Sequence, residues 1–233
     1  MTVLTKNYLA DNRNLIYSAI TKEGLNMAKE YRTVKEFNSD EYVVKRSRFI
    51  GYAKPVTTVE EANAFIAEIK SKHWDATHNV HAYILRDGGV KRYSDDGEPQ
   101  GTAGVPVLDV LEKEGLVDVC VVVTRYFGGI LLGGGGLVRA YSHSAKIGVD
   151  SAKIITMAHC LDLSVECDYT FYGKLTDFLS REDTVILDTE FTDNVKVTFR
   201  IKSENKDNIN AKLTELSYGK VFSTVVAEEF CEF

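Results

Sequence analysis

The fold is decided by the stretch from Ser94 to Tyr141, which reads SDDGEPQGTAGVPVLDVLEKEGLVDVCVVVTRYFGGILLGGGGLVRAY. Six of the nine residues from Gly128 to Gly136 are glycine, and glycine loses more backbone freedom on folding than any other residue. A run this costly to order indicates a backbone that turns tightly or approaches another group closely. Because an apolar strand pattern precedes the glycines and a helical pattern follows them, the stretch predicts a strand, a glycine loop and a helix in succession.

The predicted strand before the glycines, Val119–Val123, is apolar on both faces, which suits the centre of a sheet that is covered on both sides. The helix after the glycines carries a stripe that we expect to pack closely on that sheet. The stripe consists of Leu137, Tyr141, Ser144, Ala145, Gly148 and Ala152. Upstream, β-branched and aromatic residues predict strands over 31–37 and 42–56, the second with a kink at Gly51.

Between these strands and the acidic loop, the sequence predicts a helix and a hairpin. Thr58 and Glu61 form a capping box, in which each side chain bonds the backbone N–H of the other residue, and a helix follows. A strand is predicted over 79–86, and the Asp-Gly-Gly turn at 87–89 returns the chain antiparallel to it.

The composition changes near Ala158, where we place a domain boundary. Beyond it the pattern predicts strands over 161–167, 184–191, 195–201 and 221–228, and helices over 171–179 and 209–216. The resulting order, β-α-β-β-α-β, is the ferredoxin-like signature. We therefore expect an α+β protein with an N-terminal extension (1–26) outside the fold, a first domain (27–158) and a ferredoxin-like second domain (159–233). The second domain contains no catalytic constellation, which indicates docking or recognition.

Composition narrows the class of protein. The chain has 233 residues, of which 44% are apolar and 27% charged, as in ordinary soluble globular proteins. It has no apolar run of the ~20 residues that a membrane crossing needs, no secretory signal and no C-x-x-C pair among its four cysteines, so we expect a cytoplasmic protein with reduced thiols.

The net charge of −6 is unevenly distributed. Residues 159–233 carry 8 Lys and Arg against 15 Asp and Glu, whereas residues 1–158 carry 20 against 19. This balance excludes a globally basic nucleic-acid binder and leaves room for a local basic patch in the first domain. The candidate nucleic-acid patch consists of Lys45, Arg46, Arg48, Lys91 and Arg92, and a solvated sheet edge is the alternative interpretation.

The glycine loop offers a candidate anion site. A loop that opens a helix presents free backbone N–H groups and a positive dipole, and here Arg125 and Arg139 flank it. Leu137 stands where a Walker A loop needs Lys followed by Ser or Thr, and the dinucleotide pattern is missing as well. The alternative interpretation is that the glycines only allow the helix to pack on its sheet.

The acidic loop is open to two interpretations as well. Asp95, Asp96 and Glu98 could ligate a divalent cation, or they could form Asx-type turns in a solvated loop, and the turn is favoured. His78 and His81 point to opposite faces of a strand, so they do not form a metal pair, and His78 suits a structural hydrogen bond. No nucleophilic catalytic arrangement, cofactor motif or complete metal-ligand set can be named.

Several of these motifs resemble the Impact family, called YigZ in bacteria. The resemblance rests on the segments 95–99, 101–104, 121–129 and 132–141, and more weakly on 47–50 and 76–78. It implies a first domain similar to the fourth domain of elongation factor G and a second domain similar to its fifth. It also implies a role in regulating translation, because eukaryotic members blunt the starvation response by competing for the activator of an initiation-factor kinase.

The candidate binding residues, taken together, are His78, Asp95, Asp96, Gly97, Glu98, Arg125, Tyr126, Gly128, Gly129, Gly133, Gly135, Gly136 and Arg139. Two functional hypotheses use them. In the first, the chain is a translation-associated regulator that binds RNA, the ribosome or a translation partner through its first domain, while the second domain contacts protein. In the second, it is an enzyme that holds a phosphorylated or carboxylated small molecule at the glycine loop. Membrane binding is not expected, and the oligomeric state stays open.

Overall fold

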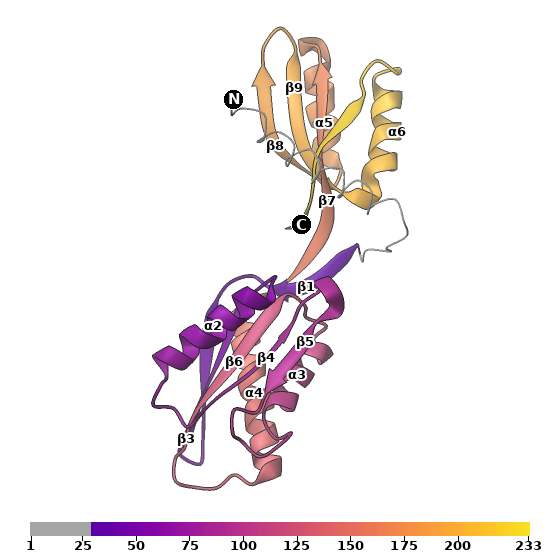
Figure 1. Ribbon diagram of the computed structural model, residues 1–233. Coiled ribbons are helices and arrows are strands. Elements are labelled where there is room, and N and C mark those ends of the chain that lie inside the picture. The colour runs from indigo at the N-terminus through magenta and orange to yellow at the C-terminus, as the bar shows by residue number, and fades with distance from the viewer. Residues whose placement is uncertain (1–28) are drawn as a thin grey trace, which may run out of the picture.

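The computed structural model describes residues 29–233, which form two lobes joined by long strands (Figure 1). The predicted extension over 1–26 lies outside the described residues. Residues 29–233 contain two antiparallel five-stranded sheets, one for each lobe. Within the same range, none of the helices combines the length and apolarity needed to cross a membrane.

The first domain is a sheet with the strand order β2-β3-β6-β4-β5 and helices on both faces. Its elements are β2 (Asn38–Val44), β3 (Ser47–Pro55), α2 (Val59–Lys72), β4 (His78–Ile84), the 3₁₀ turn η1 (Asp87–Gly89), β5 (Lys91–Ser94), α3 (Gly104–Lys113), β6 (Val119–Tyr126) and α4 (Gly134–Ser151). The predicted central strand is confirmed, because β6 lies between β3 and β4 and is buried along its first seven residues.

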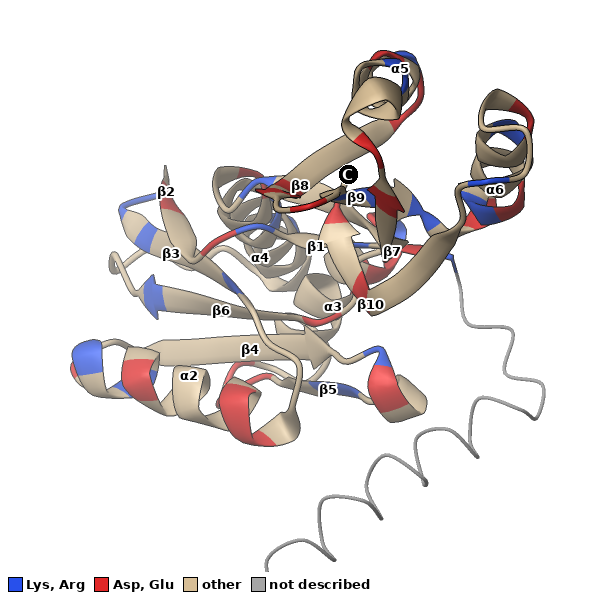
Figure 2. Cartoon of the chain, turned by 90° about the horizontal axis from the view of Figure 1, so that it is seen from above, with Lys and Arg blue, Asp and Glu red and all other residues tan. Residues whose placement is uncertain are grey.

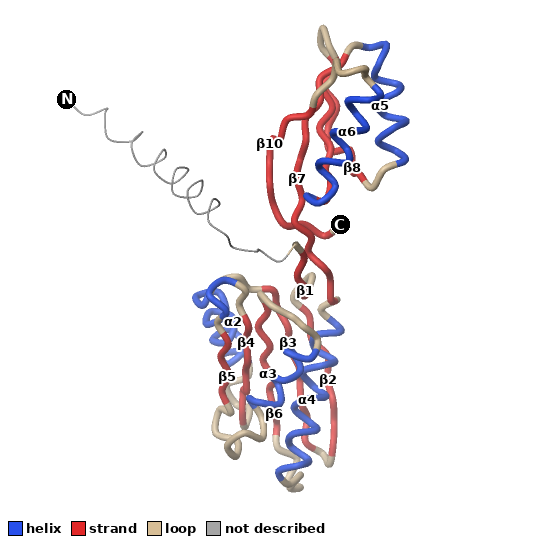
Figure 3. The backbone as a smooth tube through the Cα atoms, turned by 90° about the vertical axis from the view of Figure 1, so that its right-hand side faces the viewer, coloured by secondary structure: helices blue, strands red, loops and turns tan. Residues whose placement is uncertain are grey.

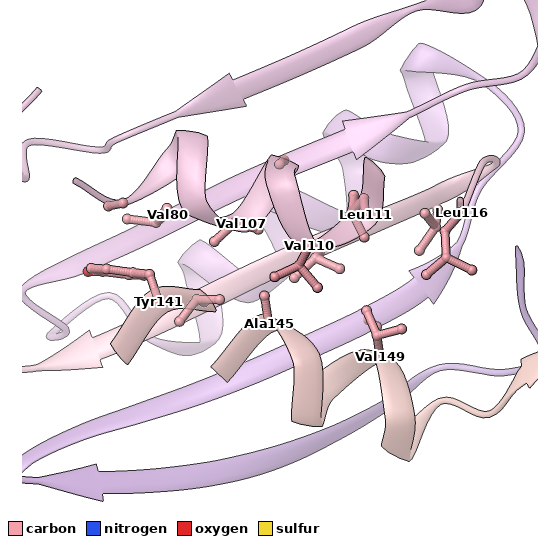
Figure 4. Packing of buried hydrophobic residues seen from close by; sticks show 14 of the residues in the cluster. Val80, Val107, Val110, Leu111, Leu116, Tyr141, Ala145 and Val149 are labelled. Atoms are coloured by element: carbon pink, nitrogen blue, oxygen red, sulfur yellow. The ribbon is translucent and has the colours of Figure 1, made fainter. Parts of the chain in front are cut away.

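Two apolar layers hold the first domain together. On one face of the sheet, Phe65 and Ile69 of α2 pack on side chains such as Val122 of β6. On the other face, α3 and α4 pack over Val121 and its neighbours, and Figure 4 shows Val107, Leu111, Tyr141 and Val149 directed into this layer. Burial on both faces explains why β6 has no polar residue between Val119 and Val123.

Helix α4 approaches the sheet closely enough to require glycine on both sides. A Cβ atom at Gly51 of β3 would lie 1.9 Å from the carbonyl oxygen of Ser144, and one at Gly148 would lie 2.7 Å from the carbonyl oxygen of Gly51. The predicted small-residue stripe of α4 is therefore confirmed as the contact with the sheet, and Gly51 serves this contact.

The predicted continuous strand over 42–56, kinked at Gly51, is wrong. The chain makes a two-residue hairpin there, with Val44 paired to Ser47, so that Lys45 and Arg46 form the turn between β2 and β3. Both turn residues have positive φ, 45° and 65°, a conformation that Asn and Gly usually provide. Because neither turn residue is Asn or Gly, the sequence gives no indication of a turn at this position.

The structure confirms one of the two hydrogen bonds of the predicted capping box. Thr58 accepts a hydrogen bond from the backbone N–H of Glu61, as predicted. The Glu61 carboxylate instead accepts from the backbone N–H and hydroxyl of Thr57, one residue before the predicted partner.

The second domain is the predicted ferredoxin-like fold. Its elements follow in the order β7 (Ile154–Cys167), α5 (Tyr169–Arg181), β8 (Thr184–Phe191), β9 (Val195–Lys202), the 3₁₀ turn η2 (Ser203–Asn205), α6 (Lys206–Leu216) and β10 (Ser223–Glu232). The strand order is β10-β7-β9-β8, and both helices cover one face, where Leu175, Phe199 and Leu213 are buried in a shared core (Figure 3).

The two lobes share β7. The first residues of β7 pair with β1 (Glu30–Val34), and its later residues pair with β9 and β10, so the predicted boundary at Ala158 falls inside one strand. Arg86 of the first domain reinforces this junction, because its guanidinium lies 4.1 Å from the ring centroid of Tyr31 and 4.4 Å from that of Phe230. A continuous strand and this cation–π contact join the domains.

We predict that Gly51→Ala lowers the free energy of unfolding by roughly 1–3 kcal/mol, because the added methyl group has no room beside α4. The matched control is Gly173→Ala in α5, where a Cβ atom meets nothing within 4 Å. The control is expected to raise the free energy of unfolding by about 0.5–1 kcal/mol, since alanine favours helix. Urea denaturation of both variants tests this prediction, and equal effects at the two sites would contradict it.

Candidate functional site

The motifs that carry the family resemblance meet at one end of the first domain, far from the second domain (Figure 1). Strand β6 ends there while β3 and β4 begin, since Arg48 is paired with Tyr126 and His78 with Arg125. We call this region the distal end. It consists of the segments 45–48, 72–77, 95–103 and 127–133 and the first six residues of α4, 134–139.

A buried ion pair lies beneath the distal end. The Glu98 carboxylate accepts a hydrogen bond from the Arg125 guanidinium at 2.5 Å and another from the Tyr141 hydroxyl at 2.7 Å. The two charged side chains are only 3% and 6% exposed. Burial and the neighbouring Glu98 carboxylate raise the pKa of Tyr141, so its hydroxyl stays protonated and donates. The Arg125 guanidinium also lies 5.4 Å from the ring centroid of Phe49 and 5.5 Å from that of Phe127.

The other two acids of the loop, Asp95 and Asp96, also accept hydrogen bonds from groups of the same chain. Asp95 accepts from the backbone N–H groups of Gly101, Ala103 and Gly104, and so caps α3, which has no side-chain cap at its own N-cap position. Asp96 bonds the Lys70 ammonium at 2.6 Å and the backbone N–H of Asn79 at 2.6 Å.

His78 and Gly97 complete the acidic loop. The Nδ1 atom of His78 donates to the Asp96 carbonyl oxygen, and Gly97, with φ of +88°, lies against the imidazole. Across the part of the chain that the structure describes, no three His, Cys, Asp or Glu side chains are placed to hold a metal ion.

The glycines of the loop divide into two kinds. Gly128 packs against the 45–46 turn, because a Cβ atom there would lie 2.0 Å from the carbonyl carbon of Arg46. Gly129, Gly133 and Gly135 have nothing within 4 Å of an added Cβ; Gly129 and Gly133 instead have positive φ, 81° and 73°, which favours glycine. Gly133 is the N-cap of α4 and has no side chain to bond its first N–H groups, including that of Gly136.

The cations of the distal end face outward. Lys45, Arg46 and Arg139 are exposed, and none has a carboxylate within 4 Å among residues 29–233. Lys45, Arg139 and Gly136 share a hollow of about 190 Å³ between the hairpin and α4. Arg48 is ion-paired with Glu41 at 2.7 Å. Figure 2 shows basic stretches gathered at the ends of β3, β6 and α2.

The structure divides the predicted basic patch. Lys91 and Arg92 lie on β5, at the opposite edge of the sheet from the hairpin. Lys91 is ion-paired with Glu112, and Arg92 bonds the carbonyl oxygen of Lys91. Arg125 belongs to the buried pair and does not form part of the surface. The outward-facing basic group therefore consists of Lys45, Arg46 and Arg139, with Arg48 beside it.

One cluster was missed by the sequence interpretation. His73 is buried, and its ring bonds the hydroxyl groups of Tyr52 at 2.6 Å and Tyr126 at 2.9 Å. Burial lowers the pKa of His73, with Lys72 as a secondary cause. The Tyr126 hydroxyl donates to Asp75. These partners are far apart in the sequence, and no local pattern marks their contact.

The chain matches two family models. The Impact N-terminal domain covers residues 45–149, which include every segment of the distal end, and a domain of unknown function, DUF1949, covers residues 165–220. The chain is 40% identical to the IMPACT family member YvyE of Bacillus subtilis over 195 residues, which are 83% of this chain and 90% of the relative.

The chain belongs to the IMPACT family. A second bacterial family member, YigZ of Escherichia coli, is 31% identical and covers 79% of this chain and 92% of its own length. A solved structure described as a hypothetical protein matches with a TM-score of 0.55 at 29% identity, over 87% of this chain and all of that one.

Eukaryotic IMPACT relatives match a shorter part of the chain than the bacterial ones do. The protein IMPACT homolog of Dictyostelium discoideum is 38% identical over 104 residues, which are 42% of this chain and 28% of that protein.

Removing one member of the buried pair is predicted to be costly. Arg125→Met is expected to lower the free energy of unfolding by roughly 3–5 kcal/mol, because the Glu98 charge stays buried without its partner. The double variant Glu98→Gln/Arg125→Met is expected to lose less than the sum of the single variants. The control is Lys91→Met, whose ion pair with Glu112 at 2.7 Å is exposed, and its cost is expected to be below ~1 kcal/mol. Similar losses from Arg125→Met and Lys91→Met in urea denaturation would contradict this prediction.

Stability is predicted to decline in mild acid because of His73. Its pKa in the folded protein lies below the ordinary value of 6.5, so the unfolded chain binds more protons once the pH falls below about 6.5. The pKa of His81 is also lowered by burial and acts in the same direction. We expect His73→Gln to lose less stability than the unchanged protein between about pH 7.5 and pH 5.5. An equal loss of stability in His73→Gln and in the unchanged protein would show that groups other than His73 cause the decline.

Proposed function

We propose that the chain is a translation-associated regulator that binds RNA through the distal end of its first domain. The observation that carries this proposal is the separation of charge at that end. Asp95, Asp96 and Glu98 are bonded to the chain's own N–H groups and cations, while Lys45, Arg46 and Arg139 are exposed without acid partners in residues 29–233. An outward cationic group next to free helix N–H groups suits phosphate oxygens.

The hairpin turn gives further support. Lys45 and Arg46 adopt positive φ, which costs free energy for residues with a side chain, although Asn-Gly would fit the same turn without strain. Two cations at a turn where they are strained support a contact surface, because their charge would then serve binding at some cost in stability. Family membership agrees with a role in translation, because the resemblance noted from the sequence implies one.

The second domain is assigned a different role in this proposal. Its residues 159–233 carry 15 acids against 8 bases, a charge that repels a nucleic-acid backbone. We infer that it contacts protein and that its attachment through β7 holds the basic distal end away from the acidic surface. The distal end is then the part of the chain that reaches the RNA.

A charge-removing variant that does not disturb folding tests the proposal. Lys45→Asn/Arg46→Gly replaces two cations with the residues that the turn conformation prefers, so the free energy of unfolding is not expected to fall. Association with purified ribosomes, measured by sedimentation across a salt series, is expected to weaken. The slope of log affinity against log salt is expected to shrink by roughly 1.4–1.8, the contribution of two phosphate contacts.

The matched control is Lys91→Gln/Arg92→Gln, which removes two cations from the opposite edge of the same sheet. This control is expected to keep the affinity and the salt slope of the unchanged protein. If the control weakens binding as much as the hairpin variant does, the contact is not at the distal end. If the unchanged protein does not associate with ribosomes at low salt, direct binding is refuted.

A further inference from the structure

Trp74 is the chain's single tryptophan, and its side chain is 83% exposed in the 73–77 loop of the distal end. Tryptophan is usually well buried, because its large apolar surface is costly to leave in water. An exposed tryptophan at a surface that also carries unpaired cations indicates a contact with something absent from the free chain.

The backbone around Trp74 is firmly held. The residue before it, His73, ends α2 by bonding the carbonyl oxygen of Ile69 at 2.9 Å, and its ring is fixed by two tyrosine hydroxyls. The residue after it, Asp75, accepts a hydrogen bond from the Tyr126 hydroxyl at 3.1 Å. Trp74 is therefore flanked by two residues tethered to the same tyrosine, so the backbone that presents its ring is already ordered.

Two cations, Lys72 and Arg48, lie over the rings of the tyrosines that bond His73 beside Trp74. Lys72 is exposed and has no carboxylate within 4 Å among residues 29–233, and its ammonium lies 5.2 Å from the ring centroid of Tyr52. Arg48 lies 5.8 Å from the ring centroid of Tyr126. The adjacent acid, Asp75, is bonded to Tyr126. An aromatic surface with a neighbouring cation is the combination that binds single-stranded nucleic acid.

On the basis of the proposed function, we propose that Trp74 is a stacking platform for an unpaired nucleobase of the bound RNA, with Lys72 placed to contact the adjacent phosphate. Bases inside an RNA duplex are already stacked on one another, so a protruding aromatic side chain can reach only unpaired ones. Stacking on a ring accepts every base, which gives the distal end a preference for single strands without sequence specificity.

Because Trp74 is the chain's single tryptophan, its fluorescence reports contact directly. Titration of the unchanged protein with single-stranded oligouridine is expected to quench this fluorescence to saturation, whereas an equal concentration of the oligouridine–oligoadenine duplex leaves it nearly unchanged. Affinity is measured separately by the anisotropy of labelled oligouridine. Trp74→Ala is expected to weaken binding about tenfold or more, and Trp74→Phe is expected to restore part of it.

The control variant is Tyr218→Ala, which removes an aromatic side chain that is 90% exposed on the second domain, and it is expected to bind as the unchanged protein does. Unchanged fluorescence at saturation, together with full affinity of Trp74→Ala, would overturn the stacking platform while leaving RNA binding by Lys45 and Arg46 in place. Absence of any anisotropy change with the unchanged protein would overturn the platform and the proposed RNA binding together.

Discussion

The distal end depends on the ion pair between Glu98 and Arg125. Each charge would be very costly to bury alone, so each fixes the position of the other. Through this pair the loop that follows β5 is tied to the end of β6, and through Tyr141 it is tied to α4 as well. Three elements that are distant in the sequence thereby meet with a defined geometry, and the glycine-containing loop is held through the elements on both sides of it, β6 and α4.

In this arrangement the acidic side chains of the distal end are bonded within the domain, whereas its cations are exposed. The loop 95–103 contributes acids, yet all three turn inward, where they cap α3, hold Lys70 or pair with Arg125. The nearby cations of the hairpin have no such partners in the part of the chain described by the structure. A chain with a net charge of −6 therefore presents a basic end, and strand β7 places the acidic second domain beyond the other end.

The sequence predicted well those features whose cause is local or periodic. The apolar run of β6, the small-residue stripe of α4 and the β-α-β-β-α-β order of the second domain each follow from side-chain periodicity. The hairpin at Lys45 and Arg46 could not be predicted, because its turn conformation is set by the pairing of β2 with β3 and not by the residues in it.

For the candidate site, the sequence indicated which segments to consider but not the contacts within them. The glycine loop, the acidic loop and Arg139 were all predicted as candidates, and the structure brings them to the same end of the domain. Burial could not be derived from the sequence, so Arg125 was expected to be a surface cation although it is part of the core. The cluster around His73 joins residues 52, 73 and 126, and no spacing rule connects them.

The most direct test of the account is to map where RNA touches the protein. Photochemical cross-linking of the purified chain to ribosomal RNA, followed by mass spectrometry of the modified peptides, requires no variant and assumes no particular residue. Cross-links are expected in the segments 45–48, 72–77 and 127–139 of the distal end. Cross-links confined to the second domain or to β5, with none in those segments, would contradict the assignment of the distal end as the RNA-binding surface.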